Sequence, residues 1–257
     1  MMILEEIIKQ IKKKSTTSRT INYNCNICRD TTWIEGTNGM KRCECYKREK
    51  LKRMWQAFGV NPGDVKKIND YKPYDEKTKM AKEKAINYIQ NFLTIKKNED
   101  NCFGLFGQAG AGKSHLVIGI GATLLNKGFG VVYMPYLEAT RQLKSNVNDD
   151  EYYLKLSERY LKADVLVIDD LFKDKVRNGK LIPGAVITSA DMKHIYPVLN
   201  YRYFNKLPTI FSTECTPDML NNLDEALAGR ILETCEPYMT IFKGEQYNYR
   251  MRKFMKK

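Results

Sequence analysis

The chain has 257 residues, 43% of them apolar, which is enough to bury the core of one ordinary domain and a small second one. Its formal net charge of +13 argues against a neutral metabolic enzyme and favours nucleic acid or an acidic protein as partner. Seven cysteines are an odd number and four of them crowd into residues 25–45, a poor pattern for disulfides and a good one for a metal.

The first residues, 1–14, place apolar side chains on one helical face, but Glu5 and Glu6 interrupt the apolar run. A signal peptide needs an unbroken run, so we expect none. The longest apolar stretch, 116–125, is about half the length that crosses a bilayer. We therefore expect a cytoplasmic protein that makes no membrane contact.

The cysteine cluster combines a CxxC pair, Cys25 and Cys28, with a CxC pair, Cys43 and Cys45. Four thiolates on two short knuckles suit tetrahedral Zn²⁺, and in so small a segment the metal would replace a missing core. An iron–sulfur cluster or free thiols remain the alternatives.

A basic helix is predicted at 46–58, followed by a breaker at 59–64 that contains two glycines and a proline. We place a domain boundary there, with a zinc-binding domain at 1–60 and a second domain at 61–257. The first 60 residues hold 13 Lys and Arg against 6 Asp and Glu, and so carry about half of the net charge.

The second domain opens with an amphipathic helix from Thr78 to Leu93 and then alternates strands with helices. Strands are predicted at 102–106, 130–134, 165–169 and 209–213, and helices at 113–126, 137–144, 151–162 and 189–204. This alternation predicts an α/β fold with a parallel sheet that helices cover on both faces.

A complete GxxxxGK[ST] motif lies between the first strand and the helix that follows it. Its glycines let successive N–H groups face phosphates, and the helix N-terminus adds its dipole. Lys113 is expected to hold the β- and γ-phosphates of ATP, and the Ser114 hydroxyl to ligate Mg²⁺. A chance match occurs in roughly one chain in a hundred of this length. The stretch expected to bind ATP or ADP comprises Gly107, Gln108, Ala109, Gly110, Ala111, Gly112, Lys113, Ser114 and His115.

An apolar run, 165–168, ends in two acidic residues, Asp169 and Asp170. A buried strand of this kind delivers carboxylates to the edge of a phosphate site. We expect Asp169 in the Mg²⁺ shell and Asp170 as the group that orients or deprotonates the attacking water. A solvated turn is the plainer alternative, but it is much weaker after a complete phosphate loop.

The order of these motifs resembles the AAA+ replicative helicase loaders of the DnaC and DnaI type, above all versions carried by phages and prophages. The resemblance rests on the cysteine cluster, GQAGAGKSHL from Gly107, VLVIDDLF from Val165, NYRYFNKLPTIFST from Asn200 and GEQYNYRMRK from Gly244. The related IstB-type transposition helper ATPases share the core and normally lack the cysteine domain.

The resemblance implies roles for two arginines. Arg230 matches the residue that reaches the γ-phosphate of a neighbouring subunit, although relatives often carry a second Arg where this chain has Thr234. A plain surface arginine is the alternative. Arg250 matches the sensor 2 arginine, which touches nucleotide in its own subunit.

The resemblance also exposes one departure. The sensor 1 position is usually Asn, and here Glu214 occupies it. A carboxylate beside a triphosphate repels it unless the carboxylate is protonated or paired with a cation. Glu214 therefore argues against fast hydrolysis.

The implied function is an ATPase that loads a hexameric DnaB-type replicative helicase onto single-stranded DNA, with subunits assembling in the presence of ATP and the zinc domain gripping the helicase. The alternatives are a nucleotide-switched adaptor that scarcely hydrolyses ATP, and a transposition helper.

Two stretches are rich in cationic groups, and the first also contains tyrosines, the composition typical of proteins that bind single-stranded DNA. They are Arg141, Lys144, Tyr152, Tyr153 and Lys155, and then Lys173, Lys175, Arg177 and Lys180. A solvated charged face is the plainer interpretation.

Overall fold

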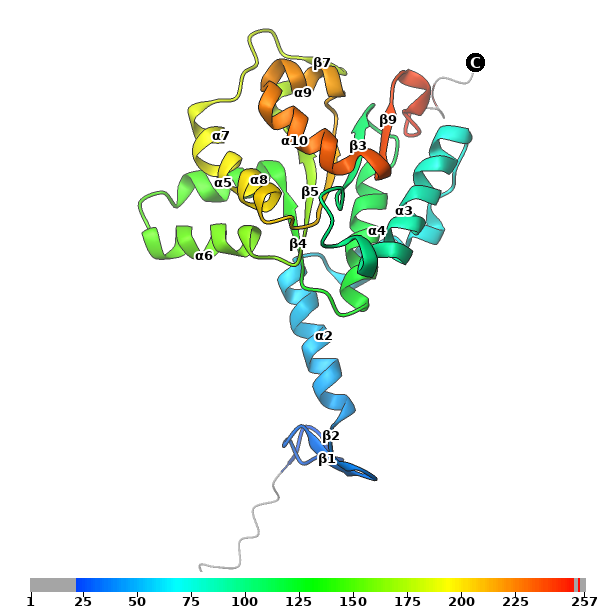
Figure 1. Ribbon diagram of the computed structural model, residues 1–257, viewed down its shortest axis with the longest axis vertical. Coiled ribbons are helices and arrows are strands. Elements are labelled where there is room, and N and C mark those ends of the chain that lie inside the picture. The colour runs from blue at the N-terminus through cyan, green and yellow to red at the C-terminus, as the bar shows by residue number, and fades with distance from the viewer. Residues whose placement is uncertain (1–21, 252–253, 255–257) are drawn as a thin grey trace, which may run out of the picture. The chain divides into compact units, whose positions relative to one another are not determined.

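The computed structural model describes residues 22–251 and residue 254. The expected helical face at 1–14 therefore lies outside the described residues. The chain divides into two compact units, 1–50 and 51–257 (Figure 1). Helix α2 (Glu44–Phe58) begins in the first unit and ends in the second.

The first unit consists of a cysteine cluster and a two-stranded antiparallel hairpin, β1 (Trp33–Gly36) and β2 (Gly39–Arg42). The Arg42 guanidinium lies 3.8 Å from the ring centroid of Trp33 and 4.3 Å from that of Tyr46. This stack and the cysteines replace the apolar core that so short a segment cannot form.

The second unit is built on a five-stranded parallel sheet in the order β4-β5-β8-β3-β9. The strands are β3 (Phe103–Gly107), β4 (Val131–Pro135), β5 (Val165–Leu171), β8 (Thr209–Thr213) and β9 (Met239–Phe242). A short antiparallel hairpin, β6 (Val176–Arg177) and β7 (Lys180–Leu181), follows β5.

The side chains of successive strand residues point to opposite faces of the sheet, so each face has its own core. Val165 and Val167 pack with α3 (Glu76–Ile95) and α4 (Lys113–Asn126). Leu166 and Ile168 pack into the opposite core. That core is covered by α5 (Tyr136–Ser145), α6 (Asp150–Leu161), α8 (Tyr196–Phe204), α9 (Pro217–Leu223) and α10 (Glu225–Cys235). The short helix α7 (Ser189–His194) contacts α5 and α8.

The α/β class and the parallel sheet covered on both faces are thus confirmed (Figure 1). One expected element differs: the helix predicted at 189–204 is interrupted at Ile195, between α7 and α8. Pro197 stands in the first turn of α8, where a residue without an N–H group starts a helix but cannot continue one. Strand β9 and helices α9 and α10 were not predicted as elements.

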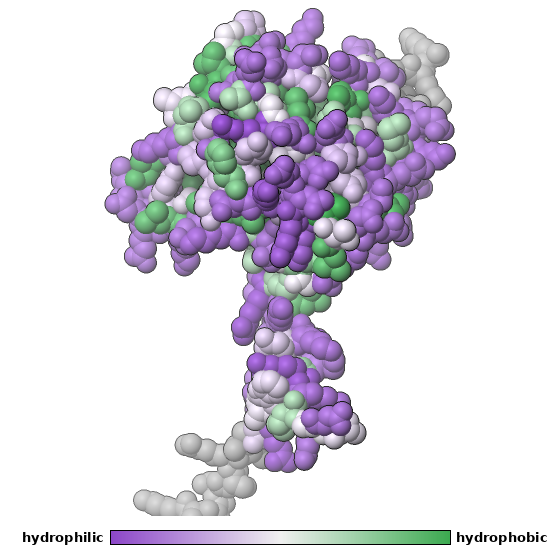
Figure 2. All heavy atoms as spheres, in the orientation of Figure 1, coloured by the Kyte–Doolittle hydropathy of each residue, from purple (hydrophilic) through white to green (hydrophobic). Residues whose placement is uncertain are grey.

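The face of the second unit seen in Figure 2 is mostly hydrophilic, with hydrophobic residues in scattered patches, as on ordinary globular proteins. Among the described helices, none combines the length and apolar character needed to cross a membrane.

Arg202 of α8 is almost completely buried, with 1% of its surface exposed. Its guanidinium donates hydrogen bonds to the carbonyls of Tyr160, Leu161, Ala163 and Pro208 and to the hydroxyl of Thr209. These acceptors form two stretches, 160–163 at the end of α6 and before β5, and 208–209 at the start of β8, so one side chain joins both stretches to α8.

We expect Arg202→Met to lower the free energy of unfolding by about 3 kcal/mol or more, because it leaves several buried carbonyls without donors. Urea denaturation without nucleotide measures this. Arg141→Met, on the exposed face of α5, is the matched control and should change stability by less than about 0.5 kcal/mol. Equal stabilities for the two variants would contradict the assigned role.

Candidate nucleotide site

The phosphate loop connects the end of β3 to the start of α4 at one edge of the sheet. Gly107 has φ +93°, and a Cβ placed there would lie 2.2 Å from the Phe242 carbonyl oxygen. Gly110 has φ +80°, and a Cβ there would meet the Asn248 side chain at 2.3 Å. Both positions require glycine, since positive φ and close contacts leave no room for a side chain.

Lys113 begins α4 and is 5% exposed. Its ammonium donates to the carbonyls of Gly107 (2.7 Å) and Gln108 (2.8 Å). Burial lowers the pKa of Lys113 to about 8, and the carboxylates of Glu214 and Asp170 oppose that shift. The ammonium of Lys113 is thus held inside the loop that it would share with phosphates.

Ser114 and His115, the next residues of α4, lie on a partly exposed stretch. The His115 ring lies edge-on to Tyr71, at a centroid distance of 5.5 Å, and its Nε2 is 2.8 Å from the Lys67 carbonyl oxygen. The Tyr71 hydroxyl donates to the Ala111 carbonyl at 2.9 Å. Residues 67–71 therefore brace the phosphate loop from outside.

Asp169 and Asp170 end the apolar run of β5 at the same edge. Asp169 is 7% exposed; it accepts hydrogen bonds from the Ser212 hydroxyl of β8 and, at 3.0 Å, from the Tyr133 hydroxyl of β4. The sequence did not single out Ser212 or Tyr133, although Tyr133 is the one polar residue of the otherwise apolar β4. They fix the carboxylate that is expected to ligate Mg²⁺.

The backbone turns sharply at Asp170, which has φ +57°. Its N–H donates to the Ser212 hydroxyl at 3.0 Å. Burial raises the pKa of the Asp170 carboxyl, and the neighbouring Asp169 charge adds to the rise. A higher pKa makes a carboxylate a better proton acceptor, which suits the role expected of Asp170.

Glu214 is the first residue after β8, and its carboxylate forms an ion pair with the Lys173 ammonium. A carboxylate at this position would repel a triphosphate unless it were protonated or paired with a cation. Glu214 is paired with the Lys173 ammonium. Lys173 had been considered for DNA contact, and the structure instead directs it to Glu214.

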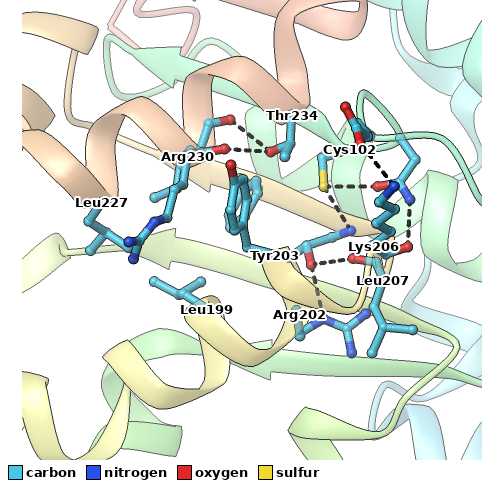
Figure 3. A pocket seen from close by; sticks show the side chains of 14 residues that line it. Cys102, Leu199, Arg202, Tyr203, Lys206, Leu207, Leu227, Arg230 and Thr234 are labelled. Atoms are coloured by element: carbon cyan, nitrogen blue, oxygen red, sulfur yellow. Dashed lines mark hydrogen bonds and ion pairs between the residues drawn. The ribbon is translucent and has the colours of Figure 1, made fainter.

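Arg230 lies on α10 and contacts α8 (Figure 3). Its guanidinium donates to the Tyr196 hydroxyl (2.9 Å) and the Asn200 side-chain oxygen (2.5 Å). It also lies 5.6 Å from the ring centroid of Tyr203 and 5.5 Å from that of Phe204. The pocket that Arg230 lines includes no residue of the phosphate loop, and the polar contacts of its guanidinium are with residues of α8.

Arg250 is exposed and follows a segment that contacts the phosphate loop. The Tyr249 N–H donates to the Gly110 carbonyl at 3.2 Å. The Tyr249 ring stacks on Tyr74, whose hydroxyl donates to the Tyr247 carbonyl at 2.8 Å. These contacts hold residues 247–249 against the phosphate loop. Arg250 follows them directly, a place that suits the role of sensing nucleotide in its own subunit.

The thiol sulfurs of Cys25, Cys28, Cys43 and Cys45 lie within 4.8 Å of one another. A tetrahedral zinc ion with Zn–S bonds of about 2.3 Å separates its sulfurs by about 3.8 Å, so the cluster fits zinc. A cluster of several irons would need more widely spaced sulfurs. Hydrogen bonds from the backbone N–H groups of Cys28 and Ile27 lower the pKa of Cys25 to about 6, which favours the thiolate form that metals bind.

The two stretches considered for DNA contact differ in their exposure. Lys175 is buried and ion-paired with Asp174 and Asp191, both at 2.8 Å, so it is not available to DNA. The Tyr153 hydroxyl is 2.9 Å from Nδ1 of His194, and this side chain is half-buried. The exposed members are Arg141, Lys144, Tyr152, Lys155, Arg177 and Lys180.

The phosphate loop follows β3, the acidic pair lies at the end of β5, and β8 lies between these two strands in the parallel sheet. This arrangement defines the nucleotide-binding core of an AAA+ protein. The chain belongs to the family of IstB-like ATP binding proteins, whose model matches residues 45–181.

Relatives in Bacillus subtilis (strain 168) agree with this family. The phage-like element PBSX protein XkdC is 33% identical over 267 residues, covering 97% of this chain and 96% of XkdC. The uncharacterized protein YqaM is 38% identical over 219 residues, covering 82% of this chain and 66% of YqaM, just under two thirds of its length. The replicative helicase loader DnaI is 28% identical over 140 residues, covering 50% of this chain and 41% of DnaI.

Among solved structures, the DnaC helicase loader has the same fold, with a TM-score of 0.55 at 22% identity over 75% of this chain and 99% of the other. A DnaA replication initiator bound to AMPPCP and single-stranded DNA has a TM-score of 0.54 at 15% identity over 76% of this chain, which spans 56% of that DnaA chain. The chain is thus an AAA+ ATP-binding protein of the group that contains the DnaC and DnaI loaders.

Proposed function

We propose that this protein hydrolyses ATP, and that it uses ATP to place a hexameric DnaB-type replicative helicase on single-stranded DNA. The observation that carries the proposal is the convergence of Lys113, Asp169 and Asp170 at one edge of the sheet, in a chain related to the helicase loader DnaI. The cysteine cluster supports a separate part that grips the partner.

The residues at the edge divide the chemistry among them. When nucleotide binds, the Lys113 ammonium exchanges the Gly107 and Gln108 carbonyls for β- and γ-phosphate oxygens. Ser114 and Asp169 offer the oxygen ligands that Mg²⁺ prefers, and that ion would neutralise phosphate charge. Asp170 accepts a proton from the attacking water.

We assign helicase contact to a zinc-binding domain at 1–60 and nucleotide chemistry to an AAA+ domain at 61–257, which forms homo-oligomers when ATP is bound. The test is co-purification of the full chain with the replicative helicase of its host, with ATP, with ADP and without nucleotide. Capture that depends on the nucleotide supports a loader. Failure of capture in every condition would contradict it.

A second candidate is a nucleotide-switched adaptor that scarcely hydrolyses ATP. Glu214 favours it, because this residue stands where the resembling loaders usually have an Asn that helps to place the attacking water, and its carboxylate is instead ion-paired with Lys173. A transposition helper would capture a transposase instead of a helicase, and the cysteine cluster argues against it. Steady-state ATP turnover separates adaptor from ATPase.

Arg230 and Asp170 give a test of catalysis between subunits. We expect Asp170→Asn and Arg230→Ala each to bind ATP and to lose hydrolysis, with the arginine contributing about 10³-fold to the rate. A mixture of the two should regain part of the activity, because some interfaces then combine an intact Asp170 with an intact Arg230.

Thermal unfolding of Arg230→Ala is the control, since this arginine also contacts Tyr196 and Asn200 of its own chain. A mixture as inactive as its two components, with both variants folded, would show that Arg230 does not act on a neighbouring subunit.

A further inference from the structure

A second lysine stands at the nucleotide site beside Lys113. Lys173 follows β5 and begins a short 3-10 turn, and Phe172 before it has φ +59°. Together with the turn at Asp170, this left-handed residue folds the chain back sharply after the acidic pair. The side chain of Lys173 thereby reaches Glu214, which lies at the end of the neighbouring strand β8.

The Lys173–Glu214 ion pair lies within electrostatic reach of the groups that are expected to bind and cleave ATP. Glu214 and Lys173 both act on the pKa of Lys113, the carboxylate raising it and the ammonium lowering it. The same two charges act on the pKa of Asp170 in the same directions: Glu214 raises it and Lys173 lowers it. The Gly107 N–H of the phosphate loop donates to the carbonyl of Cys215, the residue after Glu214, at 3.1 Å, so the ion pair lies next to the phosphate loop.

The charges at this edge call for a further cation. Three carboxylates, those of Asp169, Asp170 and Glu214, stand against two ammonium groups. A triphosphate adds several negative charges, and together with the three carboxylates they exceed the positive charge of Lys113 and the expected Mg²⁺. The side chain of Lys173 is 35% exposed, against 11% for Glu214, so the ammonium is the member of the pair that an incoming ligand can reach.

We propose that Lys173 is a second phosphate-binding cation of this site, which Glu214 positions, and that it contacts the terminal phosphate of ATP. The proposal rests on the proposed ATP chemistry. An ammonium has three N–H donors, so Lys173 can hold Glu214 and a phosphate oxygen together. Glu214 thus acts through Lys173, and no proton leaves either group.

The proposal makes Lys173 selective for the triphosphate, because ADP has no terminal phosphate to contact. We expect Lys173→Ala to weaken ATP binding about tenfold or more, the size typical of a hydrogen bond to a charged group, and to lower kcat. ADP affinity should change by less than about twofold. Lys162→Ala is the matched control, because Lys162 forms an exposed ion pair with Glu158 at 2.7 Å on α6.

The experiment measures ATP and ADP affinities, kcat and KM for the full chain and its variants, with thermal unfolding as a check on folding. A double variant, Lys173→Gln with Glu214→Gln, keeps a neutral hydrogen-bonded pair and removes both charges. If Lys173 contacts the terminal phosphate, the ATP-to-ADP affinity ratio of the double variant stays below that of the wild type.

An unchanged ATP-to-ADP affinity ratio in folded Lys173→Ala would overturn the proposal and leave the proposed ATPase standing. A ratio restored by the double variant would also overturn it, since the pair would then serve only to neutralise Glu214. A wild-type protein that binds no ATP would overturn both.

Discussion

Lys113→Ala is expected to weaken ATP binding at least about 100-fold while the second unit remains folded. Lys113 is the one cation within the phosphate loop, and its ammonium already lies against the loop carbonyls of Gly107 and Gln108. Phosphates that enter the loop would replace these carbonyls as partners. Fluorescence titration with a labelled ATP analogue in the presence of Mg²⁺ measures the loss.

Lys127→Ala is the matched control for Lys113→Ala. Lys127 lies just beyond the other end of α4, and its ammonium donates to the Ile89 carbonyl at 2.9 Å, away from the phosphate loop. Thermal unfolding without nucleotide checks both variants. An ATP affinity that survives Lys113→Ala would contradict the nucleotide site and every proposal that depends on it.

The phosphate loop could be predicted from the sequence because its residues are contiguous. Eight neighbouring positions contain the glycines, the lysine and the hydroxyl, and the flanking strand and helix fix their geometry. The cysteine cluster was predictable for a related reason: short knuckles of fixed spacing bring two thiols together locally, and only the meeting of the two knuckles depends on the fold.

The partners of the acidic pair could not be predicted in the same way. Tyr133 and Ser212 contact Asp169 because β4 and β8 both lie next to β5, an order that the sequence does not reveal. The ion pair of Lys173 with Glu214 depends on the same order, and 40 residues separate the two along the chain. Composition made Lys173 and Lys175 candidates for DNA contact, whereas the fold gives both of them acidic partners.

Replacing Cys25 and Cys28 by Ser is expected to unfold the first unit and leave the second intact. Apart from the four cysteines, the first unit's described core contains only the partly buried Ile34. Zinc binding contributes on the order of 10 kcal/mol or more to such sites, so its loss removes most of the stabilising free energy. The second unit has a separate core on each face of its sheet and needs no metal to fold.

The double variant should therefore contain no zinc, lose capture of the helicase and keep the ATP affinity of the wild type. Four thiolates fill a tetrahedral site and leave no position open for a substrate, so the metal has a structural role and not a catalytic one. Asn26→Ser is the control, because Asn26 lies in the same knuckle and is exposed. Metal analysis of the purified proteins, a helicase pull-down and an ATP titration measure the three effects. A wild-type protein without stoichiometric zinc, or a double variant that captures the helicase as strongly as the wild type, would show that the cysteine cluster does not hold the partner-binding part together.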